Sequence, residues 1–290
     1  MVHHKTAERI FRIATSLPPY ELSLDDAMNL PKAQQLCWTA MECGDRSEAI
    51  RLAVEATKLT PLCADAFNLL ADYICYNEAE RLTLLRWATR VGELCCRNRI
   101  AENTGHIHGF LDARPYLRAR TELAWTLRQL GCYEEAVSHY EALLSMEHQD
   151  HIALGMLMTS YLELRCFDKA KRLLDAHREN GGTFLNYSET VWCWLTQQDN
   201  ELFNNALNHA LNSNEHVPLL LEKPETPIEQ SPFGVALGQA DEAAEYVRVS
   251  HRIWDAFPQL KRKVITDAKK LLPAVKAERE QRIRRMRGEL

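Results

Sequence analysis

The feature that most constrains the fold is a pattern of small and apolar side chains that returns after 34 residues. The clearest copy comprises Ala124, Leu127, Gly131, Tyr133, Ala136, Tyr140 and Leu143. The next copy comprises Met158, Tyr161, Phe167, Ala170 and Leu174, with Arg165 in place of the glycine. Small residues let two antiparallel helices approach closely, and an aromatic side chain fills the space between neighbouring pairs. The period therefore predicts helix hairpins that stack on one another.

Weaker copies extend the pattern towards both ends of the chain. One comprises Cys37, Ala40, Gly44, Ala49, Ala53, Ala56 and Pro61; another starts at Leu70-Ala71; the last comprises Trp194, Ala206, Ala210 and Pro218. Three or more such units bury a continuous core that one hairpin cannot. We therefore predict an all-α, right-handed solenoid of antiparallel, tetratricopeptide-like helix pairs, with a C-terminal helical extension. The predicted pairs lie near 31–59, 63–97, 115–146, 149–179 and 187–213.

The remaining segments complete the predicted organisation. Residues 1–213 form the solenoid, with a helical cap around Ala7–Leu17 and a long loop at 98–114. Residues 214–260 form an extended segment followed by a capping helix, because 214–239 hold Pro218, Pro224, Pro227, Pro232, Gly234 and Gly238. Residues 261–290 form a basic C-terminal helix or tail, helical from Lys261 to Arg287 with Pro273 inside it.

Composition excludes several classes of protein. With 46% hydrophobic residues the chain is too apolar for disorder, yet nowhere do 18 apolar residues run together. We therefore expect no signal peptide, no membrane contact and a cytoplasmic location. The nine cysteines are odd in number and form no C-x-x-C pair, which favours buried, reduced thiols. The histidine pairs His106/His108 and His148/His151 lack partners at zinc-site spacing, so we expect no metal and no cofactor.

Three stretches together resemble a known family. They are Pro61-Leu62-Cys63-Ala64-Asp65-Ala66, Arg114-Pro115-Tyr116-Leu117-Arg118-Ala119-Arg120 and His216-Val217-Pro218-Leu219-Leu220-Leu221. In this order, and with Gly238, Asp241–Ala244, Tyr246 and Trp254 after them, they resemble the suppressor-of-tumorigenicity-seven tetratricopeptide proteins and their bacterial relatives, over residues 33–256. The resemblance implies the helical-repeat fold and adds little about function. It departs from the family at Gly109–Asp112, where relatives usually have an aromatic pair.

The inner wall of such a solenoid is lined by fixed positions of the first helix in each pair. Those positions supply the candidate partner-binding residues Trp38, Asn68, Asp72, Thr121, Trp125 and Arg128. Exposed tryptophans would anchor a peptide, because aromatic and arginine side chains dominate binding energy at interfaces. The alternative is that Trp38 or Trp125 is partly packed between repeats.

The arginine-rich start of one predicted helix adds the candidates Arg114, Tyr116, Arg118 and Arg120. Arg114 and Arg118 are four residues apart and share a helix face, so their guanidinium groups could grip a carboxylate or phosphate. The alternative is that these arginines pair internally with carboxylates such as Glu93 or Glu102. For His216, we expect a packing role at the return of the chain.

Charge is unevenly distributed. Residues 261–290 hold eleven Lys or Arg and four Asp or Glu, a net charge of +7. Because the whole chain has a net charge of −5, residues 1–260 have a net charge of −12. The basic segment either docks on the protein's own acidic groove or binds nucleic acid, for which it lacks stacking aromatics. No nucleophile motif or phosphate loop is present, and an enzyme built around 98–120 is the weakest alternative. We expect a non-enzymatic scaffold that binds a protein or peptide partner; a nucleic-acid-associated or regulatory protein acting through the tail is the alternative.

Overall fold

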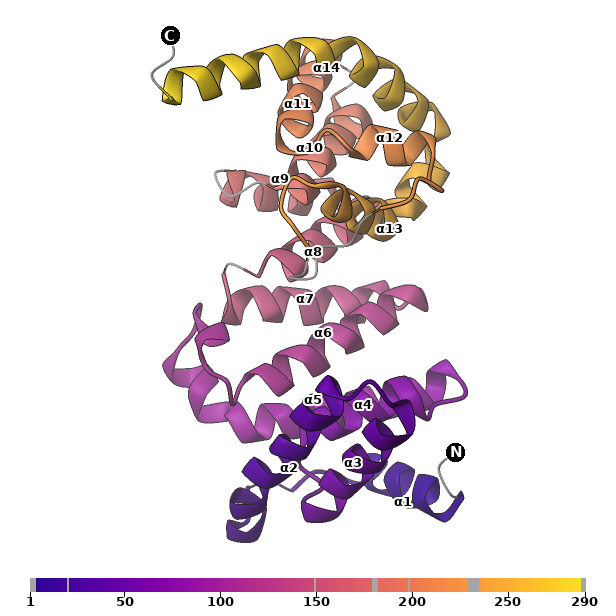
Figure 1. The fold of residues 1–290 in the computed structure, drawn as a ribbon, viewed down its shortest axis with the longest axis vertical. Helices are drawn as coiled ribbons and strands as arrows, with labels where there is room; N and C mark the ends of the chain where they lie inside the picture. Colours follow the sequence, from indigo (N-terminus) through magenta and orange to yellow (C-terminus); the bar gives the residue numbers. More distant parts are fainter. Residues whose placement is uncertain are drawn as a thin grey trace. The chain divides into compact units, whose positions relative to one another are not determined.

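The computed structural model describes residues 4–19, 21–148, 150–178, 182–197, 199–228 and 235–287. Regular structure in these ranges is helical, apart from isolated bridges from Gly105 and His106 to Glu147 (Figure 1). The predicted all-α class is confirmed. The chain divides into two compact units, Met1–Leu154 and Gly155–Leu290, which are described separately below.

Unit 1 is a series of helices that pack in sequence order. They are α1 (His4–Ala14), α2 (Leu24–Glu42), α3 (Arg46–Leu59), α4 (Ala64–Tyr73), α5 (Glu78–Glu102), the 3-10 turn η1 (Ile107–Gly109), α6 (Arg114–Gln129) and α7 (Tyr133–Met146). In the series from α2 to α7, each pair of successive helices is in contact. Helix α4 also contacts α2 and α6. Helices α2, α4 and α6 are therefore neighbours, as the first helices of stacked hairpins would be. The right-handed solenoid itself stays a prediction.

Side-chain caps define where several helices begin. Ser23, Asp45, Asn77 and Asp199 each accept a hydrogen bond from a backbone N–H in the first turn of α2, α3, α5 and α11 (Asn200–Ser213), respectively. Such caps satisfy N–H groups that have no partner within the helix and contribute about 1 kcal/mol each. The hairpin starts are therefore encoded locally.

Two hairpin turns repeat the same backbone geometry 34 residues apart, which supports the sequence period directly. Gly131 has a φ of 80° and Arg165 a φ of 56°, so both lie in the left-handed region. After each, a cysteine N–H reaches back across the turn, from Cys132 to Leu127 O at 2.9 Å and from Cys166 to Tyr161 O at 2.8 Å. This is the hydrogen-bond pattern of a helix C-terminus that ends in a left-handed residue.

Unit 2 begins within α8 (His151–Glu163) and contains the remaining helices. They are α9 (Phe167–Ala176), α10 (Thr183–Thr196), α11, α12 (Val217–Glu222), α13 (Ala240–Ala256) and α14 (Pro258–Met286). Helix α10 packs on α9, α11 and α13, while α14 packs on α11, α12 and α13. Pro273 lies inside α14, as predicted.

Some predicted boundaries are wrong. Residues 217–222, expected to be extended, form α12; Pro218 sits in its first turn, where a proline needs no N–H partner. The predicted loop at 98–114 starts later, because α5 continues to Glu102. Pro232 and Gly234 lie outside the described residues. No helix in the described ranges is both long enough and apolar enough to cross a membrane.

Candidate functional site

One buried carboxylate joins three helices of unit 1. Asp65, at the start of α4, is fully buried. It accepts a hydrogen bond from Gln34 Nε2 of α2 at 2.6 Å and from Arg118 Nε of α6 at 2.9 Å, and Arg118 Nη2 forms a second, parallel bond. A two-pronged guanidinium–carboxylate pair restricts both distance and orientation. Asp65 therefore sets the positions of α2, α4 and α6 relative to one another.

Asn68 completes this group, which we call the Asp65 cluster (Gln34, Asp65, Asn68 and Arg118). Its side-chain amide lies 3.3 Å from Asp65 Oδ1 and 3.3 Å from the carbonyl oxygen of Pro115. The second contact ties α4 to the first turn of α6. Buried polar groups are costly unless they are paired, and here the carboxylate has three donor side chains.

An apolar pocket lies beside the Asp65 cluster. This Trp38 pocket has a volume of about 400 Å³ and is lined by Leu30, Pro31, Gln34, Gln35, Trp38, Leu62, Ala64, Gly92, Cys95, Leu111, Asp112, Pro115 and Tyr116. Trp38 is 39% exposed and Leu111 60% exposed, so a ligand can reach apolar surface at the rim. Trp38 is therefore partly buried, which agrees with the alternative of partial packing, and it also lines the pocket.

The wall formed by α5 and α6 depends on a glycine. A Cβ atom at Gly92 would lie 2.9 Å from both Cα and Cβ of Tyr116, so only glycine allows the two helices to approach this closely. Tyr116 is buried, and burial raises the pKa of its hydroxyl to about 12. That hydroxyl accepts a hydrogen bond from Arg120 Nη1. Tyr116 is thus a neutral, fixed part of the wall.

Three thiols lie at or near the pocket. Burial raises the pKa of Cys95 to about 12. Cys37 and Cys63 are fully buried with their sulfur atoms 3.6 Å apart, and the hydrogen bond between them, together with burial, raises the pKa of Cys37. All nine cysteines are free thiols, but the expected burial holds for four of them, since four others are half-buried and Cys132 is exposed. Of the three thiols near the pocket, Cys95 lines it, and a protonated thiol is a weak nucleophile, so Cys95 contributes apolar surface rather than reactivity.

A second pocket flanks the same end of α6. This Arg114 pocket has a volume of about 390 Å³ and is lined by His108, Arg114, Leu117, Arg118, Thr121, Glu122, Asp150 and Ile152. Arg114 is exposed, and its Nε donates to the carbonyl oxygen of His108 at 3.4 Å. The predicted shared face of Arg114 and Arg118 is confirmed, because both line this pocket.

Several other predicted partner-binding residues pair with, or are buried among, residues of the chain itself. Asp72 pairs with Arg81 on α5. The guanidinium of Arg128 lies 5.8 Å from the ring centre of Trp125, which is half-buried. Asn68 and Arg128 are buried, so they are not offered to a partner as expected. Arg118 does pair internally, as the alternative held, but with Asp65 rather than Glu93 or Glu102.

Sequence reasoning missed Asp65 as the centre of the site. A signal was present, because Asp65 and Arg118 belong to two of the stretches that carry the family resemblance. The pocket-lining residues Cys95 and Leu111 gave no signal, since they come from a long helix and a loop outside the repeat pattern. For the predicted histidine pairs, the rings of His106 and His148 lie 6.3 Å apart, edge to face. In the described part of the chain, no group of three or more His, Cys, Asp or Glu could hold a metal ion.

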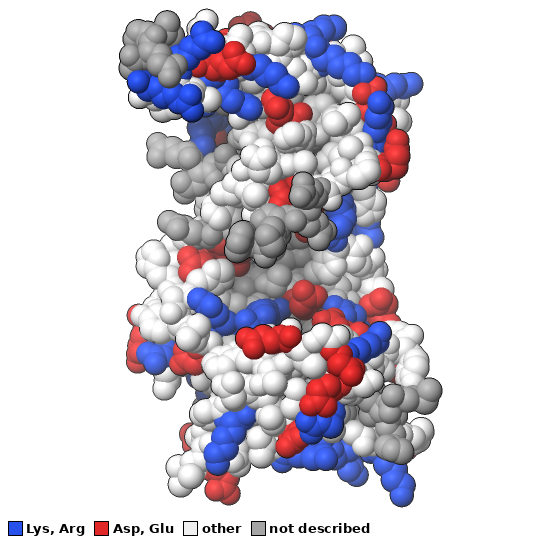
Figure 2. All heavy atoms as spheres, in the orientation of Figure 1, with Lys and Arg blue, Asp and Glu red and all other residues white. Residues whose placement is uncertain are grey.

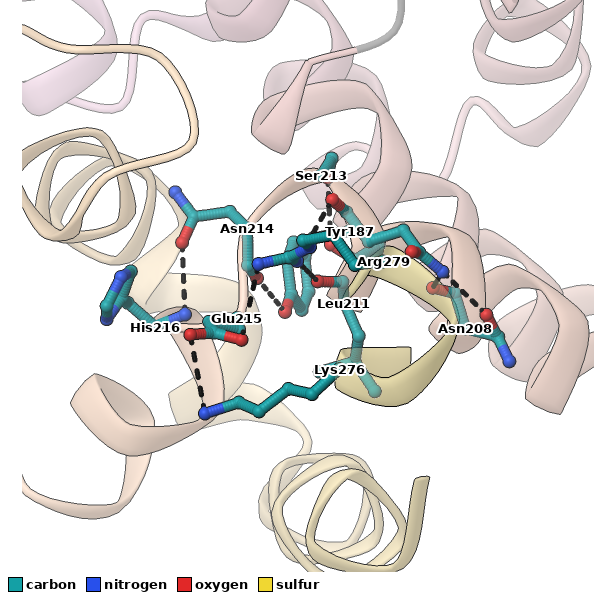
Figure 3. A network of polar contacts seen from close by, with 11 residues as sticks. Tyr187, Asn208, Leu211, Ser213, Asn214, Glu215, His216, Lys276 and Arg279 are labelled. Atoms are coloured by element: carbon teal, nitrogen blue, oxygen red, sulfur yellow. Dashed lines mark hydrogen bonds and ion pairs between the residues drawn. The ribbon is translucent and has the colours of Figure 1, made fainter. Parts of the chain in front are cut away.

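The basic C-terminal segment docks on unit 2 itself. Lys276 and Arg279 of α14 lie 3.4 and 3.5 Å from the carboxylate of Glu215. Arg279 Nη2 also donates to the carbonyl oxygens of Leu211 and Asn212 at 3.2 and 3.3 Å, at the end of α11 (Figure 3). The segment therefore binds a helix C-terminus and its turn, where positive charge is favoured, rather than a groove. His216 lies in the same turn, and its N–H donates to Asn214 Oδ1 at 3.0 Å.

The last turns of α14 carry arginines that make no such contacts. Arg282, Arg284, Arg285 and Arg287 are exposed, and no carboxylate pairs with them in the described ranges. Lys and Arg side chains gather along α14 in the space-filling view (Figure 2). Compared with known proteins, the chain matches no family model and no curated sequence.

Proposed function

We propose that this chain is a non-enzymatic interaction scaffold, a tetratricopeptide-like solenoid that holds an extended or helical segment of a partner protein at the Trp38 pocket. The helix hairpins, the 34-residue period and the recurring turn geometry support the repeat architecture. The resemblance to the suppressor-of-tumorigenicity-seven family agrees with it. Partner binding by stacked helix pairs uses the face lined by the first helices, which here are α2, α4 and α6.

The observation that carries this proposal is the Trp38 pocket itself. It offers an accessible tryptophan in an apolar recess, the kind of site where a partner's side chain contributes most to affinity. Its walls are set by the Asp65 cluster and by the contact of Gly92 with Tyr116, so little ordering is needed on binding. Tyr116 and Cys95 on its walls are poorly suited to act as a general base, because burial raises the pKa of each to about 12, far from neutral pH.

Site-specific photocross-linking in the native host tests the proposal. A benzophenone amino acid replaces Gln35, which is exposed at the pocket, or Lys58, which is exposed on α3. We expect a discrete adduct with one protein from position 35, none from position 58, and loss of the adduct when Trp38→Ala is added. Trp38→Phe, which keeps an aromatic ring, should retain it. Equal adducts at both positions, or an adduct that survives Trp38→Ala, would reject the pocket as the binding site.

A second candidate function rests on the end of α14. Four exposed arginines within six residues, without carboxylate partners in the described ranges, could bind a polyanion such as a nucleic-acid backbone. Replacing Arg282, Arg284, Arg285 and Arg287 with Gln keeps the docked part of the helix, including Lys276 and Arg279. We expect earlier elution from heparin at low salt if this function is real, and unchanged elution rejects it.

A further inference from the structure

We propose that the partner segment is acidic next to its apolar anchor: a bulky apolar side chain enters the Trp38 pocket while a carboxylate of the same segment binds Arg114. This inference rests on the proposed function and names the chemistry of the partner. The experiment below separates failure of the inference from failure of the function.

The two pockets share the first turns of α6. Pro115 and Tyr116 line the Trp38 pocket, whereas Arg114, Leu117 and Arg118 line the Arg114 pocket. One short stretch of helix therefore separates them. A single segment that crosses the start of α6 contacts both pockets.

Arg114 is the cation that the fold leaves available at this place. Arg114 donates one long hydrogen bond, 3.4 Å from Nε to the carbonyl oxygen of His108, and no carboxylate pairs with it in the part of the chain that is described. A guanidinium has five N–H donors in a planar fork that matches a carboxylate. Arg118 adds positive charge from the same face: its side chain is 41% exposed although Asp65 holds it in place.

The carboxylates around these pockets already have partners. Glu122 lies 3.0 Å from Arg81. Asp150 accepts a hydrogen bond from the N–H of Ala153 at 2.9 Å, at the start of α8. On the Trp38 side, Asp112 lies 3.2 Å from Arg99. Glu122 and Asp112 thus have arginine partners, whereas Arg114 has no carboxylate partner in the described ranges. An anionic group is therefore favoured over a cationic one beside Arg114.

Selection from a random peptide library tests this preference without a known partner. Dodecapeptides displayed on phage are selected against the immobilised full-length chain, against Arg114→Glu and against Arg172→Glu. Arg172 is an exposed arginine of α9 that lines neither pocket, so it is the matched charge-reversal control. Circular dichroism verifies that all three are equally helical. Arg118 is left unchanged because it holds Asp65.

We expect the wild type and Arg172→Glu to enrich peptides in which a bulky apolar residue is accompanied by Asp or Glu. Arg114→Glu should lose the acidic preference and keep the apolar one. A synthetic peptide from the wild-type selection should bind Arg114→Glu at least about tenfold more weakly, the range for loss of a charged hydrogen bond, and the difference should shrink as salt screens the charges.

Two results overturn the inference but not the proposed function. In the first, the wild type enriches apolar peptides that contain no Asp or Glu. In the second, Arg114→Glu enriches acidic peptides as strongly as the wild type does. Enrichment of basic peptides also overturns it. If no peptide is enriched on any of the three chains, the inference and the proposed function fail together.

Discussion

Each unit provides one clear example of how helices are linked, although neither device is confined to its unit: Phe67 and Trp87 pack edge to face in unit 1, and Thr183 donates to buried Glu242 in unit 2. In unit 1, the carboxylate of Asp65 joins α2, α4 and α6 through Gln34, Asn68 and Arg118. In unit 2, aromatic rings do this work: Tyr246 of α13 lies with its ring centre 5.4 Å from that of Phe184 and 5.5 Å from that of Tyr187, both of α10, and 6.3 Å from that of Trp254.

The two links differ in how much of the volume between the helices their side chains fill. Large rings occupy the volume between α10 and α13, and edge-to-face contacts add to the stabilisation by buried area. A carboxylate with its donors links helices while filling much less volume, and the Trp38 pocket lies beside it. Space is not confined to unit 1, because Trp194, Phe203 and Lys263 line a pocket of about 440 Å³ in unit 2. The two links should nevertheless respond differently to substitution, since one depends on charge and the other on packed volume.

The largest effect is expected from Trp254→Ala. Trp254 is almost fully buried and its Nε1 donates to Ser250 Oγ at 2.8 Å. Its removal should cost about 3–5 kcal/mol of unfolding free energy. Hydrogen exchange followed by mass spectrometry should show faster exchange in 155–287, with little change in 4–148. Trp254→Phe should cost much less, and a uniform rise in both units would contradict the comparison.

Arg118→Met should be the most damaging single change to the Asp65 cluster. It leaves a fully buried carboxylate with only amide donors. Removing one partner of a fully buried ion pair costs about 3–5 kcal/mol, but the Arg118 side chain is 41% exposed. We expect the lower end, about 3 kcal/mol, because Gln34 and Asn68 remain to donate to Asp65. Faster exchange should be confined to unit 1 peptides. The double variant Arg118→Met with Asp65→Leu should recover much of the loss; if it is no more stable than Arg118→Met alone, the buried charge is not the cause.

Unit 1 should also lose stability in mild acid. Burial, with a smaller contribution from Arg120, lowers the pKa of His139 on α7 from 6.5 to about 4. Between pH 6.5 and about 4, the unfolded chain therefore binds a proton at His139 that the folded chain does not. The contribution of neutral His139 to the unfolding free energy is fully present above pH 6.5 and is lost as the pH falls towards 4. Because His139 is partly exposed, we expect about 2 kcal/mol at most. His139→Gln should flatten the pH dependence of unit 1 unfolding; an unchanged slope would contradict it.

The smallest effects concern the two equivalent turns, one in each unit. Gly131→Ala places a Cβ in the left-handed region and should cost about 1 kcal/mol. Arg165→Gly removes the same strain and should stabilise by about 0.5–1 kcal/mol. Urea denaturation of the two variants provides the measurement. Changes of equal sign would show that the turns are not equivalent.

Much of the fold could be predicted because its determinants are local in sequence. The period placed the hairpins, and the position of Gly131 marked a turn whose geometry Arg165 reproduces. The prediction for 217–222 was wrong because proline was interpreted as a helix breaker, whereas Pro218 begins a helix. The pairing of Asp65 with Arg118 could not be predicted from spacing, since it joins residues 53 apart through the packing of α4 on α6. Repeat position places Trp38 on the predicted inner face, and in the structure Trp38 lines an accessible pocket.

The Asp65 cluster makes the two pockets depend on the same pair of oxygen atoms. Gln34, on the wall of the Trp38 pocket, donates to Oδ2 of Asp65, and Arg118, on the wall of the Arg114 pocket, donates to both oxygens. If either donor is removed, the carboxylate of Asp65 is left with the other donor and with Asn68. Substitutions at Gln34 and Arg118 should accordingly be non-additive, and a double-mutant cycle would measure how strongly the two recesses communicate.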